Sequence, residues 1–316
     1  MITIAVAGGT SPGLGRAVVT AIQDYPDKLH AVVLSRKSSA VPQWLQETGI
    51  EVRKVDYNSE DSLFAALQGV HTVLCVLLAA DGTWAQTQIN LLNAGLRAGI
   101  QRFAPAEFGV GGLAAHRVDM FKPSLEVTAE LRKAKENNPN FEYAGFHVGL
   151  FMNYLGYGAP DAEAATHGMR DTWVFVWDVK KMKASIPLTK EGEIPTMTMT
   201  EIGDVGRYVA ASCLQPKGSW KEDFSMAGET LKLDEVVRKI EQVREAKMDV
   251  VYRPYEQVEL EEKEEEVSYP NKFWLQIELL VCRNIVGEGI VSPVVNELCQ
   301  NVKPLSVDQY LRRFWG

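Results

Sequence analysis

Two hydrophobic periods alternate through residues 1–150 of the chain. Short apolar runs, typical of buried strands, are separated by segments in which apolar residues recur every three or four positions, as on one face of a helix. Strands are predicted at Ile2–Ala7, His30–Leu34, Glu51–Asp56, Val70–Leu78, Arg102–Ala106 and Phe141–Val148. Because a crossover separates each run from the next, the pattern predicts an α/β fold, a doubly wound parallel sheet of the Rossmann type with its ligand at the carboxyl ends of the strands.

The helices between these strands are delimited by capping residues and by glycines. Ser, Thr and Asn favour helix starts, and glycine favours the left-handed conformation that follows a helix end. Helices are therefore predicted from Leu14, over Pro42–Thr48 up to Gly49, from Asn58 or Ser59 to Gly69, over Thr83–Ala98 up to Gly99, and from about Pro123 to Asn137. The stretch from Gly109 to Asp119 is predicted to be irregular.

Beyond Leu150 the alternation ends, and no repeat or separate linker is visible. The predicted elements are loop and helix over Ala159–Arg170, an aromatic strand at Thr172–Trp177, a helix at Glu201–Leu214 capped by Thr200, a helix at Glu235–Arg244 capped by Asp234, a strand at Val250–Tyr252 and an acidic helix at Tyr255–Glu266. We divide the chain into a dinucleotide-binding domain, 1–150, and a smaller C-terminal substrate-binding lobe, 151–316, which is interleaved with the main domain.

A glycine-rich turn joins the first strand to the first helix. Gly9 is expected to allow the sharp turn, Gly13 to let backbone amides approach a pyrophosphate, and Gly15 to let the helix lie close to the strand. The amides and the positive dipole end of the helix then bind the phosphates. The residues predicted to contact the cofactor here are Gly9, Thr10, Ser11, Pro12, Gly13, Leu14 and Gly15.

The end of the second strand, Ser35-Arg36-Lys37, indicates which dinucleotide is bound. An acidic residue here would favour NAD through the ribose hydroxyls, whereas the cations Arg36 and Lys37 suit the 2′-phosphate of NADPH. The alternative is that both cations belong to a solvated loop. Asp56, at the end of the third strand, either contacts the adenine or caps the next helix.

Charge, cysteine spacing and apolar run length indicate which binding partners and which cellular compartment to expect. The net charge is −8, but Glu256–Glu266 alone contributes −6, so the rest of the chain is nearly balanced. No basic surface is implied, and neither nucleic acid nor an acidic membrane is an expected partner. The four cysteines are scattered without a Cys-x-x-Cys pair and are expected to be reduced core residues. A strand directly after Met1 and the lack of a long apolar run lead us to expect a cytoplasmic protein.

Catalytic residues are harder to assign from the sequence. The Tyr-x-x-x-Lys pair of ordinary short-chain dehydrogenases does not occur, no serine lies on a nucleophile elbow, and no histidines are spaced to bind a metal, so no metal is predicted. His147, near the end of the predicted sixth strand, is expected to face the cofactor, where it could donate a proton. The alternative is a packing role.

Several motifs together resemble one family. They are the glycine turn, the Arg-bearing second turn, Gln86, the run Arg102-Phe103-Ala104-Pro105-Ala106-Glu107-Phe108-Gly109 and the helix Leu125–Arg132. The chain resembles the NmrA-like, isoflavone-reductase-like branch of the atypical short-chain dehydrogenases, well over 1–150 and weakly beyond. It departs from the family run at Ala106, where the family has serine, and its glycine spacing is closer to that of ordinary short-chain enzymes.

The resemblance implies an NADPH-dependent reductase of small, often aromatic or heterocyclic metabolites, with the substrate between the main domain and the lobe. Cofactor contacts are also assigned to Leu78, Gln86, Ala104 and Pro105. The family's catalytic lysine falls on Thr128, so either proton delivery has moved or activity on oxygen substrates has been altered or lost. Lys122 is the nearest candidate for a moved proton donor, provided that it lies outside the helix and that partial burial lowers its pKa. The alternative is that Lys122 is a solvated lysine.

Two functions therefore stay open. The first is a cytosolic reductase of a carbonyl, conjugated alkene or imine, with an apolar pocket that could be lined by Phe151, Tyr154, Tyr157, Trp173 and Trp177. The second is a non-catalytic dinucleotide sensor, similar to the NmrA regulators, that binds a partner protein. The irregular 109–119 segment and the Glu-rich helix are candidate partner surfaces or solvated faces. A homodimer is left open.

Overall fold

The computed structural model describes residues 1–78, 81–169 and 173–316. Arg170 and Thr172, at the ends of two predicted segments, lie outside the described residues. Among the described residues, no helix combines the length and the apolar character needed to cross a membrane.

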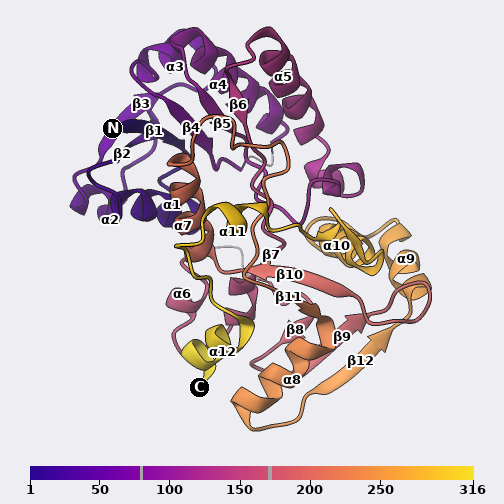
Figure 1. The fold of residues 1–316 in the computed structure, drawn as a ribbon. Coiled ribbons are helices and arrows are strands. Elements are labelled where there is room, and N and C mark those ends of the chain that lie inside the picture. Colours follow the sequence, from indigo (N-terminus) through magenta and orange to yellow (C-terminus); the bar gives the residue numbers. More distant parts are fainter. Residues whose placement is uncertain (79–80, 170–172) are drawn as a thin grey trace.

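A six-stranded parallel sheet forms the N-terminal half of the molecule (Figure 1). Its strand order is β3-β2-β1-β4-β5-β6. The strands are β1 Ile2–Ala7, β2 Leu29–Arg36, β3 Glu51–Val55, β4 Thr72–Cys75, β5 Arg102–Ala104 and β6 Glu142–Tyr143. The order reverses between β1 and β4, which is where dinucleotides bind in doubly wound sheets. The predicted fold class is confirmed.

Alternate residues of each strand enter two separate cores, because successive side chains point to opposite faces of a sheet. Ile4 and Val6 of β1 pack with α1 (Leu14–Gln23) and α2 (Gln43–Glu47), whereas Ala5 and Ala7 pack on the other face. That second face is covered by α3 (Glu60–Ala66), α4 (Trp84–Ala98) and α5 (Ser124–Asn137).

One helix from the C-terminal half returns to the nucleotide-binding sheet. Helix α7 (Ile202–Cys213) packs along α1, and its Val205 and Val209 share a core with Val18 and Ile22. Gly206 makes this close approach possible, since a Cβ there would lie 2.4 Å from the Ala17 carbonyl oxygen. The C-terminal half of the chain thus contributes a helix to the core on this face of the main sheet.

The lobe itself is built on two three-stranded sheets and a third core (Figure 1). The first sheet has the order β11-β10-β7 and the second β12-β9-β8. Its elements are β7 Leu150–Phe151, α6 Ala162–Ala165, β8 Trp177–Asp178, β9 Lys183–Pro187, β10 Thr196–Thr200, β11 Glu229–Lys232, α8 Leu233–Arg244, β12 Asp249–Arg253, α9 Tyr255–Lys263, α10 Asn271–Cys282, β13 Ile285–Val286, β14 Gly289–Ile290, α11 Val294–Leu298 and α12 Val307–Trp315. Short 3-10 turns lie at Ala114–His116, Asp119–Phe121 and Met152–Gly156.

The predicted sixth strand, Phe141–Val148, is wrong in length. Strand β6 ends at Tyr143, and the apolar residues after it leave the sheet. The Gly145 amide donates to the Glu222 carbonyl, and the Val148 amide donates to the Gly109 carbonyl. These residues are buried by loops rather than by strand pairing, which a hydrophobic run alone does not distinguish.

Other predicted boundaries change for local reasons. The fourth strand ends at Cys75 rather than at Leu78, and among the described residues 173–177 of the predicted aromatic strand, Trp177 alone belongs to a strand, β8 (Trp177–Asp178). Glu201, not Thr200, caps α7, because its carboxylate accepts from the Asp204 amide while the Thr200 hydroxyl donates to the Val148 carbonyl. Helix α8 begins at Leu233, so Asp234 lies in its first turn rather than at its cap.

Three helices of the lobe, α10, α11 and α12, were not predicted. Helix α10 packs its apolar residues into the lobe core, and α12 closes the chain against the same core. A signal for α12 was present in the sequence, because Ser306 at its N-cap and Gln309 in its first turn form a capping box.

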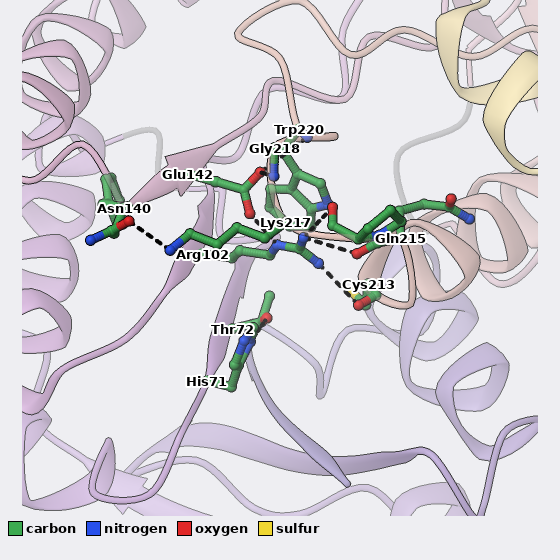
Figure 2. Close-up of polar contacts among 12 residues, drawn as sticks. His71, Thr72, Arg102, Asn140, Glu142, Cys213, Gln215, Lys217, Gly218 and Trp220 are labelled. Carbon is green, nitrogen blue, oxygen red and sulfur yellow. Dashed lines mark hydrogen bonds and ion pairs between the residues drawn. The ribbon is translucent and has the colours of Figure 1, made fainter.

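A buried polar network lies at the amino ends of β5 and β6 (Figure 2). Arg102 Nε donates to Glu142 Oε2 at 2.9 Å, and the guanidinium also donates to the carbonyls of Cys213, Gln215 and Pro216. The other Glu142 oxygen accepts from the Gly218 amide at 2.7 Å. The network therefore ties the end of α7 to the main sheet, at the edge opposite to the strands' carboxyl ends.

Candidate active site

The glycine turn after β1 is tightly packed on the strand ends. Gly8 has φ +87°, and a Cβ there would lie 2.9 Å from the Val76 carbonyl oxygen. The sharp turn assigned to Gly9 is thus made by Gly8. Gly9 instead fits between valine side chains, each 3.1 Å from where its Cβ would be.

The start of α1 is close to this turn, as predicted for Gly15. A Cβ on Gly15 would lie 2.5 Å from the Gly8 carbonyl oxygen and 2.5 Å from Ser11 Oγ. Ser11 Oγ accepts from the Gly15 amide at 3.1 Å. Gly13 is the N-cap residue of α1, between Pro12 and Leu14. A turn in which only glycine fits, followed directly by a helix start, suits a pyrophosphate. Cofactor contacts by Thr10 and its neighbours remain a prediction.

Three cations gather where β2 and β3 end. Arg36 ends β2 and is exposed, and the Lys37 amide donates to the Val55 carbonyl. Lys54, which pairs with Ser35 in the parallel register, directs its ammonium to Ser35 Oγ at 3.2 Å and to the carbonyls of Arg36 and Ser39. The sequence analysis missed Lys54, which lies opposite Ser35 because β2 extends to Arg36, beyond the predicted end of that strand at Leu34.

Asp56 has a local role in the turn before α3. Its Oδ1 accepts from the Asn58 amide at 3.0 Å, while Ser59 caps α3 by accepting from the Ser62 amide. Helix capping by Asp56 is therefore wrong, and the Asn58 or Ser59 alternative resolves to Ser59.

The other predicted cofactor residues differ in burial. Ala104 and Pro105 are buried where β5 ends, whereas Leu78 is 69% exposed. Gln86 is exposed on α4 and bonds to Asn90. Gln88 is the buried glutamine of α4, and its Oε1 accepts from the Ala106 amide at 2.8 Å. The expected contacts of Leu78 and Gln86 with a cofactor remain predictions.

An acid–base cluster lies beyond the carboxyl ends of β5 and β6. Thr128 Oγ1, on α5, donates to Glu107 Oε1 at 3.1 Å. Glu107 Oε2 faces His147 Nε2 at 3.6 Å, and His147 Nδ1 lies 3.0 Å from Asp223 Oδ1. The Ser225 hydroxyl donates to the same Asp223 oxygen. Two of the predicted catalytic residues, Thr128 and His147, are therefore brought together through Glu107.

The His147 imidazole is held between two carboxylates in a tight glycine-lined space. Burial opposes its charged form, but the hydrogen bonds and charges of Asp223 and Glu107 outweigh burial and raise the pKa of His147 to about 9. A Cβ on Gly145 would lie 2.8 Å from Glu107 Oε2 and 3.0 Å from His147 Cε1. We conclude that His147 is protonated at neutral pH. The absence of a side chain at Gly145 leaves room for the Glu107 carboxylate beside the imidazole.

Lys122, the third predicted catalytic residue, lies apart from the Glu107 and His147 contacts. Helix α5 begins at Ser124, so Lys122 meets the condition of lying outside the helix. Its expected partial burial is wrong, however, because the side chain is 58% exposed and its ammonium bonds to Asp119 at 2.6 Å. Asp119 in turn accepts from Gln276 of α10.

A cavity of about 700 Å³ lies between the glycine turn and the lobe. Its wall is shared by the start of α1, α6 and the segment after β8; the lining residues are Pro12, Arg16, Tyr157, Gly158, Ala162, Glu163, Thr166, Gly168, Met169, Asp178, Lys180 and Lys181. Of the five predicted pocket aromatics, Tyr157 lines it. Trp177 is buried instead, and its indole N–H donates to the Leu233 carbonyl.

The sequence analysis missed two members of the acid–base cluster. Glu107 stood inside the quoted family-like run, directly after the fifth strand, which was a usable signal. Asp223 had none, because it lies 76 residues from His147 in a loop without a motif. All four cysteines are free and buried, as predicted. In the parts of the chain that the structure describes, no group of three or more His, Cys, Asp or Glu side chains could hold a metal ion.

Comparison with known proteins extends these findings. Residues 2–310 match the sequence profile of the NmrA-like family. The oxidoreductase BOA1 of Botryotinia fuckeliana is 29% identical over 241 residues, which cover 75% of this chain and 74% of that protein.

Solved structures show the same fold. An isoflavone reductase crystal structure superposes with a TM-score of 0.72 at 20% identity, covering 98% of both chains. The complex of AtPrR2 with NADP+ and (+)-pinoresinol superposes with a TM-score of 0.76 at 19% identity, covering 99% of this chain and 98% of that one. The resemblance inferred from the motifs is confirmed.

Proposed function

Because this chain belongs to the NmrA-like family, whose profile matches residues 2–310, we propose that it is an NADPH-dependent reductase. Its substrate is a small aromatic or heterocyclic metabolite with a carbonyl, a conjugated alkene or an imine. The relative BOA1 is an oxidoreductase, and the structurally similar AtPrR2 is seen with NADP+ and the aromatic compound pinoresinol, which supports both the reaction class and the substrate class.

One observation carries the proposal: the carboxyl edge of the main sheet holds both a glycine turn at a helix start and an acid–base cluster. The glycine turn and the cations Arg36 and Lys54 lie at the β1, β2 and β3 ends, where the adenosine half of a dinucleotide binds. Glu107 and His147 follow β5 and β6, on the half of the sheet where the nicotinamide belongs.

Each part of this edge has a separate task. The glycine turn and the start of α1 would hold the pyrophosphate, and the Arg36 turn would hold the 2′-phosphate by charge-assisted bonds. NADPH, when bound, supplies the hydride. The chain must then place the substrate, exclude water and provide a proton.

The test is incubation with NADPH and a panel of aromatic enones, ketones and cyclic imines. We expect NADPH absorbance to fall only when a panel compound is present, with a product heavier by two hydrogens. NADPH binding without consumption for any compound, together with retention of a protein partner, would favour the second candidate.

That second candidate is a non-catalytic dinucleotide sensor that binds a partner protein. The observation that favours it is Thr128 at the family's lysine position, together with the pairing of Lys122 to Asp119. A sensor would bind both redox forms of the cofactor and capture its partner from extract in one form only. Turnover with any panel compound contradicts it.

A further inference from the structure

We propose that Glu107 passes a proton from the charged His147 to the substrate and that Asp223 connects His147 to solvent, with Thr128 orienting the Glu107 carboxylate. This inference rests on the proposed reductase function, because a proton is needed only where hydride reaches a substrate. The chain thereby replaces the family's lysine with a carboxyl–imidazole–carboxylate relay.

The four side chains come from four separate segments and contact one another in succession. Thr128 on α5 donates to one Glu107 oxygen at 3.1 Å, and the other oxygen faces His147 Nε2 at 3.6 Å. The opposite ring nitrogen contacts Asp223 at 3.0 Å. Each group thus faces the next through a different atom, which is the geometry a relay requires. The gap between Glu107 and His147 is long for a hydrogen bond, as is common before substrate binds.

Exposure gives the relay a direction. The His147 side chain is 6% exposed, Glu107 is 18% exposed, and Asp223 is 55% exposed. Water therefore meets the relay at Asp223 and not at the buried imidazole. Glu107 is the end that lies next to the β5 carboxyl terminus, where the nicotinamide half of a dinucleotide binds.

The neighbouring charges do not compete for the His147 proton. Glu222, beside Asp223, is bound by Arg132 of α5 and by the Tyr143 hydroxyl. The carboxylates that contact the imidazole are Glu107, from the β5 side, and Asp223, from the loop before β11. Their hydrogen bonds keep His147 charged against the effect of its burial.

The proton and electron balance is closed. Hydride addition to a carbonyl carbon moves the π electron pair onto oxygen. As this charge develops, His147 Nε2 gives its proton to the Glu107 carboxylate, which passes it to the substrate oxygen, and His147 regains a proton from water through Asp223. The sum is one NADPH, one substrate and one solvent proton consumed for each reduced product and NADP+.

Two acceptors separate hydride transfer from proton delivery. Reduction of acetophenone leaves an alkoxide that must be protonated, whereas the dye cation malachite green becomes neutral on accepting hydride and needs no proton. We expect Glu107→Gln to lower acetophenone reduction by about 10²–10⁴-fold and to leave dye reduction and NADPH affinity nearly unchanged. Thr128→Val should act in the same direction, and Glu126→Gln, an exposed residue two positions earlier on α5, is the matched control.

Equal losses of ketone and dye reduction in Glu107→Gln would overturn the relay and show that Glu107 has a structural role. A wild-type protein that reduces the dye but not the ketone would also overturn the relay. No NADPH consumption with either acceptor would instead contradict the proposed function. A titration of His147 by NMR on the cofactor-free protein then still tests the relay. Its imidazole should titrate near pH 9 and at lower pH in Glu107→Gln and in Asp223→Asn. A pKa that neither variant moves would overturn the relay without any assay of turnover.

Discussion

Arg102 of β5 and Glu142 of β6 form a buried ion pair, and the further hydrogen bonds of both side chains reach residues 213–218 of the C-terminal half (Figure 2). Their side chains are 4% and 5% exposed, and Nε lies 2.9 Å from Oε2. The remaining donors of Arg102 are taken by backbone carbonyls beyond α7. A buried ion pair with this many partners stabilises the fold little relative to a well-packed apolar pair. Removing one member is nevertheless strongly destabilising, because the other is left as an unpaired buried charge.

We therefore predict that Arg102→Met lowers the free energy of unfolding by about 3–5 kcal/mol, because Glu142 keeps its burial and loses its cation. Urea denaturation measures the change. Arg238→Met removes an exposed ion pair on α8 and should change stability far less. Equal losses of unfolding free energy in the two variants would show that burial of the Arg102–Glu142 pair does not set the cost of breaking it.

Cofactor choice should depend on Arg36. Because a charge-assisted bond to the 2′-phosphate is lost, Arg36→Ala should reduce the ratio of NADPH to NADH affinity by roughly ten- to a hundredfold. Titration calorimetry with both cofactors measures the ratio. Lys28→Ala, an exposed cation just before the opposite end of β2, is the control. An unchanged ratio in Arg36→Ala would remove Arg36 from the phosphate site and leave Lys37 or Lys54.

The glycine turn should not tolerate a methyl group at Gly15. A Cβ there meets the Gly8 carbonyl oxygen at 2.5 Å, so Gly15→Ala should cost about 1–3 kcal/mol of stability and weaken NADPH binding. In Gly95→Ala the added Cβ meets the flexible Ile100 side chain, and stability should change little. Thermal unfolding with and without NADPH compares them, and a Gly15→Ala protein as stable as the wild type would contradict the close packing.

Stability should depend on pH through His147. Its folded pKa of about 9 lies above its ordinary value of 6.5, so the imidazolium contributes stability that is complete below pH 6.5 and is lost as pH rises through 9. His147→Gln should remove this decline, as measured by urea denaturation between pH 6 and about 10. Parallel curves for the two proteins would show that the carboxylates do not hold the proton.

Lys122 should be dispensable for chemistry. Its ammonium is exposed and paired with Asp119, away from Glu107 and His147, so Lys122→Met should leave the chemical step within about twofold. Single-turnover kinetics measure that step. A fall of about 10²–10⁴-fold would restore Lys122 as the proton donor.

Thr128→Lys is the complementary change, because it brings an ammonium beside Glu107. A gain of carbonyl reduction would show that α5 still presents residue 128 to the substrate.

The nucleotide-binding half could be predicted from local patterns. Strand periodicity, Gly99 in its left-handed cap and Ser59 at the α3 N-cap are all consequences of neighbouring residues, and each is visible in the sequence. The glycine turn was found for the same reason, although the residue with positive φ proved to be Gly8. Side-chain period and cap chemistry act over a few residues and need no knowledge of the fold.

The lobe and the acid–base cluster depended on contacts that no local pattern encodes. Residues 144–148 are as apolar as a strand, yet they pair with the loop at 222–226, so β6 stops at Tyr143. That same loop brings Asp223 to His147, and the turn after β5 brings Glu107 to its other side. The sequence by itself determined the sheet, its order of elements and the cofactor class expected there. Only the tertiary structure decided which groups share a proton, because burial and partner charges, rather than residue type, set the charge state of His147.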